Sequence, residues 1–154
     1  MGDGKRRLPL VKEPEAAREE DVARPAWHWT IIGAFATWLA WLLLEMVAVP
    51  LLGAVDRSAA AGTTTQPLLV AVHFSALALA AFAGGLFVGR FGVQAGRLHA
   101  AIAGAIVVVP PWLVVATRVS GAGDVPFLAV LLALLAGWST GAAYLGGRLG
   151  FRLR

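Results

Sequence analysis

Cysteine is absent from all 154 residues of the chain. The protein therefore has no disulfide, no thiolate nucleophile and no cysteine-ligated metal or iron–sulfur centre. Charge is also scarce, since Asp, Glu, Lys and Arg make up only 14% of the residues, against roughly a quarter in soluble domains. With 58% hydrophobic residues and a mean hydropathy of +0.74, the composition excludes an ordinary soluble domain and predicts an integral membrane protein.

Sequence motifs for catalysis are lacking as well. The chain contains no HExxH, Walker loop, GxSxG elbow or zinc-ligand cluster. The string GAGD at 121–124 resembles the GxGD motif of membrane aspartyl proteases, a family that needs a second catalytic aspartate close by. The other candidate, Asp56, lies in a different connection, so the string is better explained as a glycine turn before a helix. We therefore expect no enzymatic activity.

Four apolar runs divide the chain. The first, Trp27–Val55, exceeds the roughly 20 residues needed to cross a bilayer core, and it is far longer than the apolar region of a signal peptide cleaved near 59–61. The sequence predicts an all-α integral membrane bundle of four transmembrane helices. The predicted spans are 27–55, 67–89, 98–117 and 126–147, within a transmembrane domain at 26–149, after a polar arm at 1–25 and before a basic tail at 150–154.

The distribution of basic residues predicts the topology. Most of the 13 Lys and Arg lie in the N-terminal arm, the central turn and the C-terminal tail. The turn and the tail supply Arg90, Arg97, Arg148, Arg152 and Arg154. Since cytoplasmic segments are enriched in Lys and Arg, we predict an inner-membrane protein with both termini cytoplasmic and with Trp27 and Trp29 as an interfacial anchor. The basic residues form no single stripe, so no nucleic-acid partner is expected.

The second and fourth spans end in similar segments, GGLFVGRFG and AAYLGGRLG. Gly89, Arg90 and Gly92 align with Gly147, Arg148 and Gly150. This match suggests two tandem helical hairpins in the same orientation, like the parallel repeats of some transporters. Three identities in apolar sequence also leave chance open as an explanation.

Small residues recur at about four-residue spacing in the same two spans. They are Gly84, Gly85 and Gly89 in the second span, and Gly137 and Gly141 in the fourth. Such faces allow helix backbones to approach closely. Two explanations remain open at this point: the faces pack within this chain, or they serve self-association or docking on a larger complex.

Glu45 is a carboxylic acid inside the first apolar run, where a charge costs a few kcal/mol and marks a paired or functional position by default. At 1.5 Å per residue, Glu45 lies about 10–16 Å, His73 roughly 9 Å and Pro110 about 12 Å below the outer boundary. Pro110 and Pro111 each free a backbone carbonyl. We expect Glu45 to be protonated or hydrogen-bonded to His73 as a structural contact between helices, with the prolines shaping the bundle. The alternative is a polar pocket in which Glu45 carries a proton with His73 as its partner.

His28 and His99 begin the first and third spans near the same face. Two neutral imidazoles on facing helices could ligate a haem or another metal. Both positions are also close to the headgroups, where histidine is an ordinary interfacial residue. We expect no cofactor and keep haem ligation as the weaker alternative.

The segment GGLFVGRFG, followed by GRLHAAIAG, resembles small bacterial membrane proteins of four helices whose second and fourth spans are glycine-rich. The similarity covers mainly Gly84–Gly104. It implies a four-helix inner-membrane protein and provides no functional residue.

The absence of catalytic motifs, the small-residue faces and six tryptophans favour a non-catalytic accessory or assembly subunit of a larger membrane complex. Its expected partners are the lipid bilayer and other membrane subunits or a second copy. The alternative is a small proton- or ion-coupled carrier or channel centred on Glu45.

Overall fold

The computed structural model describes residues 25–58, 65–92, 95–117 and 125–153. The expectations for the arm before Pro25, the segment 59–61, the turn 121–124, Arg118 and Arg154 fall outside these residues. The described chain folds into five helical segments and contains no strand. They are α2 (Trp27–Ser58), α3 (Gln66–Phe91), α4 (Arg97–Val107), α5 (Val109–Ala116) and α6 (Val125–Arg152). The predicted all-α fold is therefore confirmed.

Four helical stretches are long and apolar enough to cross a membrane: α2, α3, α4 together with α5, and α6. Many of their large apolar side chains are exposed on the outside of the bundle, which would be unfavourable in water. Leu43 is 65% exposed and Met46 is 73% exposed. Contiguous exposed apolar surface of this kind is typical of a membrane-facing protein. The fold is that of a helical transmembrane bundle, consistent with a multi-pass membrane protein.

α2 and α6 extend furthest beyond the bounds that hydropathy predicts. α2 continues past Val55 to Ser58, whose hydroxyl donates a hydrogen bond to the Val55 carbonyl at 2.9 Å. α6 continues to Arg152, so most of the predicted tail at 150–154 is helical. Hydropathy marks where apolar side chains stop, whereas a helix continues as long as its i to i−4 backbone bonds persist.

The third span is divided by its two prolines. α4 ends at Val107, α5 begins at Val109, and Val108 lies between them. Pro110 and Pro111 have no backbone N–H and therefore free the carbonyls four residues earlier. The helical path resumes at once, since the Trp112 N–H donates to the Val108 carbonyl at 3.1 Å. The span is thus interrupted at Val108, two residues before Pro110.

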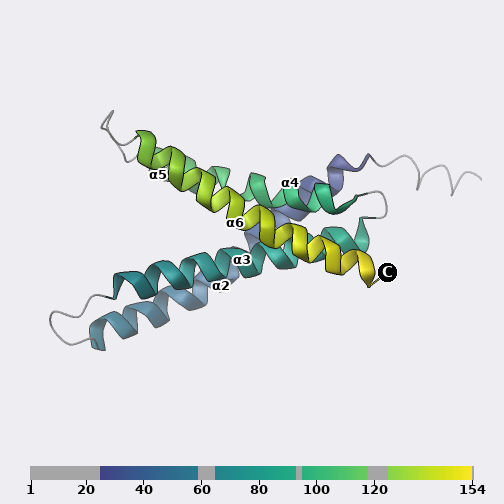
Figure 1. The fold of residues 1–154 in the computed structure, drawn as a ribbon. Helices are drawn as coiled ribbons and strands as arrows, with labels where there is room; N and C mark the ends of the chain where they lie inside the picture. Colours follow the sequence, from purple (N-terminus) through teal and green to yellow (C-terminus); the bar gives the residue numbers. More distant parts are fainter. Residues whose placement is uncertain (1–24, 59–64, 93–94, 118–124, 154) are drawn as a thin grey trace, which may run out of the picture.

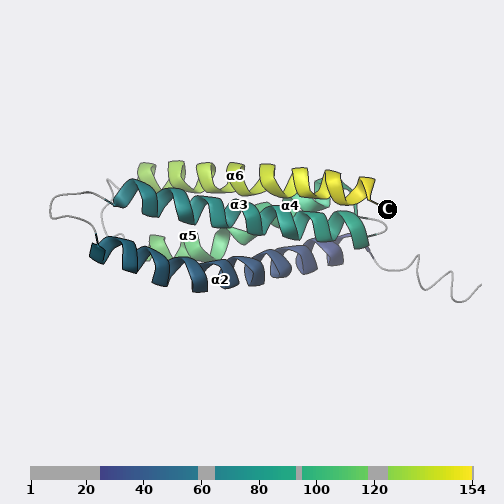
Figure 2. The ribbon, with the colours of Figure 1, turned by 90° about the horizontal axis from the view of Figure 1, so that it is seen from below.

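The helices form two hairpins, α2 with α3 and the α4–α5 pair with α6 (Figure 1). α3 and α6 run in the same direction and make the most extensive helix contact, while α5 contacts its neighbours little. The hairpins lie together at the end where α2 begins and α6 ends, and they diverge toward the other end in Figure 1. Figure 2 shows the bundle from below, with α3 between α6 and α2 in this view. The predicted tandem arrangement in one orientation agrees with this topology.

Glycines allow α3 and α6 to touch at backbone level. A Cβ atom at Gly85 would lie less than 3.0 Å from the Ala143 carbonyl oxygen, and one at Gly89 equally close to the Gly147 carbonyl oxygen. These two contacts join residues that occupy equivalent places in the two similar segments. Equivalent residues meet in this way when two hairpins are related by an axis parallel to the helices, as in parallel repeats.

The core is built mainly from small residues. One cluster joins Ala34, Leu77, Ala103, Val107 and Val108 at the centre of the bundle. Buried hydroxyls are satisfied by backbone carbonyls, because the Ser139 hydroxyl donates to the Gly104 carbonyl at 2.7 Å. The centre is therefore tightly packed.

Candidate intramembrane polar site

The structure brings Glu45 of α2 and His73 of α3 into direct contact. Nδ1 of His73 lies 2.8 Å from Oε2 and 3.0 Å from Oε1 of Glu45. A third residue joins them: Nε1 of Trp41, one turn before Glu45, donates to Oε1 at 3.0 Å. The carboxyl group therefore meets two ring nitrogens, and we call Trp41, Glu45 and His73 the polar triad.

Within the polar triad, the Glu45 carboxylate is more buried than the His73 imidazole. The Glu45 side chain is 17% exposed, whereas the His73 side chain is 43% exposed. Trp41 packs against the central core cluster. Away from water a hydrogen bond to a carboxylate is electrostatically stronger, and an unpaired carboxylate is correspondingly costly. The pairing explains how the bundle holds an acidic residue at this depth.

The broken third span contributes one of its two prolines to the site. Pro111 lines a cavity of about 110 Å³ together with Trp41, His73 and Val108. Pro110 lines a different groove, between α2 and α4, beside Trp38. Of the four residues predicted to share a pocket, the structure thus groups Glu45, His73 and Pro111, while Pro110 faces elsewhere.

A second cavity touches the triad from the side of the helix ends. It measures about 160 Å³, lies between α2 and α3, and is lined by Gly53, Asp56, Leu69 and His73 among others. Sequence reasoning places Asp56 in a connection and considers it only as a partner for Asp124 of the GAGD string. A signal was present, because Asp56 follows Glu45 by about three helical turns and so falls on the same face of a continuous helix.

The predicted glycine faces differ in their environment. Gly84, Gly85 and Gly89 lie against neighbouring helices so closely that a Cβ atom would clash. Nothing lies within 4 Å of a Cβ built at Gly137 or Gly141. Packing within the chain therefore holds for the three glycines of α3 and does not hold for the two of α6.

The face that α6 buries lies on another side of the helix from Gly137 and Gly141, and it includes Leu128 and Ser139 nearer the start of the helix. It carries Ala143, Gly146, Gly147 and Gly150. Gly141 precedes Ala143 by two residues, which places it about 200° around the helix and on the outside. Sequence reasoning missed these packing positions, although Gly146 and Gly150 have the four-residue spacing that indicates close packing.

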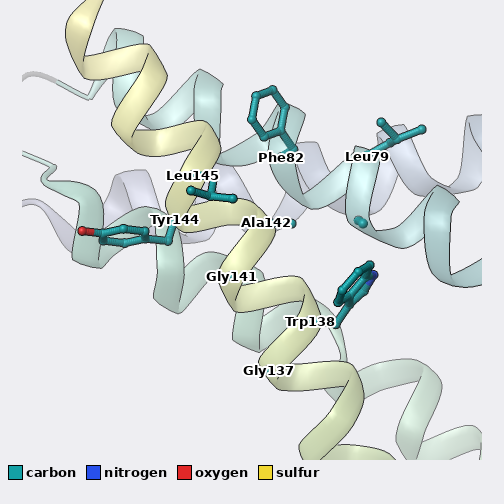
Figure 3. Close-up of a pocket in the computed structure, with 9 residues that line it drawn as sticks. Leu79, Phe82, Gly137, Trp138, Gly141, Ala142, Tyr144 and Leu145 are labelled. Atoms are coloured by element: carbon teal, nitrogen blue, oxygen red, sulfur yellow. The ribbon is translucent and has the colours of Figure 1, made fainter.

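Gly137 and Gly141 line an open apolar groove of about 580 Å³ between α3 and α6. We call it the α3–α6 groove. Figure 3 shows Trp138 on the side of α6 that faces Leu79 and Tyr144 on the opposite side of the helix. The Trp138 ring is fixed, because its Nε1 donates to the Phe74 carbonyl at 3.0 Å. The groove therefore has a defined wall on the α3 side and a floor of glycine backbone.

The basic residues at the end where α2 begins have local partners. Arg90 donates to the Leu153 carbonyl at 3.1 Å, and the Arg97 guanidinium lies 5.9 Å from the Phe151 ring centre, a cation–π arrangement. Arg148 is exposed. These contacts join the end of the second span and the start of the third span to the end of the fourth.

The two tryptophans predicted as an anchor differ in exposure. Trp27 is 54% exposed, as an interfacial anchor would be. Trp29 is partly buried against the cluster of Val88, Ala95 and Ala100. Gly92 makes room for this ring, since a Cβ there would lie 3.2 Å from the Trp29 ring. Trp29 is thus a packing residue as well.

The two histidines near the starts of the first and third spans, His28 and His99, each have a local contact. The His28 ring stacks on Trp27 with centroids 3.8 Å apart. Nδ1 of His99 accepts the Gly96 N–H at 3.3 Å, which caps the start of α4. Within the described ranges, no group of three or more His, Asp or Glu could hold a metal ion. Neither contact supports the haem alternative.

No protein-family model, curated protein or solved structure matches the chain. The resemblance to small glycine-rich bacterial membrane proteins therefore stays a prediction.

Proposed function

We propose that the protein is a non-catalytic accessory or assembly subunit of a larger complex in the inner membrane, with both termini cytoplasmic. The supporting observation is the outward position of Gly137 and Gly141. Glycine inside a helix costs about 0.5–1 kcal/mol relative to alanine. The other glycines of α3 and α6 offset this cost through close backbone contacts, whereas these two have no such contact in this chain.

The α3–α6 groove fits a helix of a partner subunit. Transmembrane helices associate where small residues let backbones approach and dispersion contacts accumulate. Gly137 and Gly141 are one turn apart and supply that floor, while Trp138 and Leu79 supply large apolar walls. A partner helix with a matching small-residue face would complete the packing that the isolated chain leaves open.

Extraction from native membranes tests this proposal. We expect native mass measurement in mild detergent to find the wild-type chain bound to a defined membrane subunit. The double variant Gly137→Leu/Gly141→Leu should lose that companion, because the added side chains fill the groove. Ala83→Leu, an exposed change on α3 outside the groove, is the matched control and should retain it. A partner-free monomer from wild-type membranes would contradict the proposal.

A proton- or ion-coupled carrier or channel is the second candidate, and the polar triad favours it. Glu45 is the only acidic residue in the described part of the four spans away from the helix ends. Intramembrane carboxylates of this kind mark ion pathways and proton relays in many membrane proteins. The cavities on either side of His73 give such a site room for exchange.

Glu45→Gln is the decisive change for the second candidate. In reconstituted vesicles with a trapped pH dye, a carrier centred on Glu45 should lose about tenfold or more of its proton flux, because the amide cannot exchange a proton. His99→Gln removes a titratable group at the other end of the bundle and should leave the flux unchanged. If Glu45→Gln transports as well as the wild type, Glu45 is not the coupling group.

A further inference from the structure

His73 lies between two cavities that differ in character. The inner cavity, about 110 Å³, is lined by Trp41, Pro111 and apolar side chains of α3 and α6 beside the interrupted third span. The outer cavity, about 160 Å³, extends from His73 along α2 to Asp56. Asp56 is exposed near the end of α2. The imidazole therefore lies between the partly shielded carboxylate of Glu45 and a space that reaches the helix end.

The hydrogen bonding of the His73 imidazole shows which ring nitrogen faces Glu45 and which one is left to accept a proton. Nδ1 faces the Glu45 carboxylate at 2.8 Å, so a neutral ring that donates there carries its proton on Nδ1 and has a lone pair on Nε2. Among the described residues no hydrogen bond to Nε2 is formed. Asp56 in turn accepts a hydrogen bond from the Thr65 hydroxyl, which holds the carboxylate across the connection between α2 and α3.

We propose that Asp56, the outer cavity and His73 form a one-sided proton path from the aqueous end of α2 to Glu45. Asp56 collects a proton at the surface and releases it to water in the cavity, which is large enough to hold several molecules. That proton binds Nε2 of His73 while the Nδ1 proton moves to Oε2 of Glu45. The ring ends neutral with its proton on Nε2, and Glu45 ends as a neutral acid. The reverse sequence restores both groups.

Among the described residues, Arg57 is the other charged group beside this path. It adjoins Asp56 on α2, it is exposed, and its guanidinium lies 3.4 Å from a Cβ built at Gly53. Within the described ranges, α3 adds only His73 at this end, and α5 and the first half of α6 add no titratable residue. The titratable residues of α4 and α6, which are Arg97, His99, Tyr144, Arg148 and Arg152, belong to the other half of the bundle.

The path deepens the second candidate function and rests on Glu45 as its exchanging group, but proton exchange with one side does not require transport. It predicts that the rate of Glu45 protonation depends on the outer cavity. Gly53 lines that cavity, and a Cβ there would meet only the flexible Arg57 guanidinium at 3.4 Å. Gly53→Leu therefore fills the cavity without removing a titratable group.

Time-resolved infrared spectroscopy after a pH jump tests the path on the full chain in lipid nanodiscs. The protonated carboxyl band of Glu45 is identified by its loss in Glu45→Gln. We expect Gly53→Leu and His73→Gln to slow the appearance of this band about tenfold or more, since each interrupts the relay. Asp56→Asn should slow it severalfold. Ala54→Leu, the same type of change on the exposed neighbouring residue, is the matched control and should match the wild type.

Unchanged rates in both Gly53→Leu and His73→Gln would overturn the path, and so would a Glu45 carboxyl that keeps one protonation state across the pH range. If one of the two variants fails to fold, the other decides the result. A cavity-dependent rate together with an absence of proton flux in vesicles would support the path and contradict the carrier. The experiments can therefore contradict the carrier without contradicting the proton path.

Discussion

Replacing Gly85 by alanine is expected to destabilise the bundle by about 2–4 kcal/mol, among the largest effects of a single methyl group in this chain. The new Cβ would lie less than 3.0 Å from the carbonyl oxygen, carbon and Cα of Ala143. Because these are backbone atoms, no side-chain rotation can relieve the clash. α3 and α6 would have to separate along the most extensive helix contact of the fold.

The same substitution at Gly141 is the matched control. Nothing lies within 4 Å of a Cβ at this position, so alanine meets no clash and gains about 0.5–1 kcal/mol of helix propensity. Reversible unfolding of the isolated chain in bicelles, followed by tryptophan fluorescence, measures both free energies. Equal losses at Gly85 and Gly141 would show that the α3–α6 crossing is not where the structure places it.

The second large effect on stability is expected from substitutions in the polar triad. His73→Leu should cost about 1–2 kcal/mol of unfolding free energy, because the shielded Glu45 carboxylate keeps only the Trp41 donor. Glu45→Leu removes the costly group itself and leaves a histidine that is 43% exposed on its side chain, so its cost should be smaller. The double variant should lose less than the sum of the two single changes, with a coupling of about 1 kcal/mol.

The control for this cycle pairs Glu45→Leu with His99→Leu. His99 caps α4 and belongs to the other half of the bundle, so the two losses should add within about 0.5 kcal/mol. The same bicelle unfolding assay measures all variants. Additive losses for Glu45 and His73 as well would mean that the two side chains do not interact.

Length and hydropathy are sufficient to predict the fold of this chain. Four runs of apolar residues and the prolines of the third span predict the helices and the break at Val108. Depth along each helix also pairs Glu45 with His73, because rise per residue is constant. These features depend on position along a helix axis, which the sequence states directly.

Which face of each helix points into the bundle is harder to predict from the sequence. Every face of these helices is apolar, so no polar stripe shows which side is inside. For this reason Gly137 and Gly141 could not be distinguished from the packed Gly146 and Gly150. For a related reason the sequence did not place Trp41 or Asp56 beside His73, since neither residue is unusual until the partner across the helix pair is known.

The contact between Glu45 and His73 in lipid tests the central claim most directly. Solid-state NMR can measure the dipolar coupling between ¹³C in the glutamate carboxyl groups and ¹⁵N in the histidine rings of the full chain in bilayers. The structure predicts a strong coupling to Nδ1 of His73, in keeping with a nitrogen–oxygen distance of 2.8 Å, and none from Glu45 to His28 or His99. A Glu45 carboxyl with no coupling to His73 and with close contact to lipid acyl chains would contradict the account.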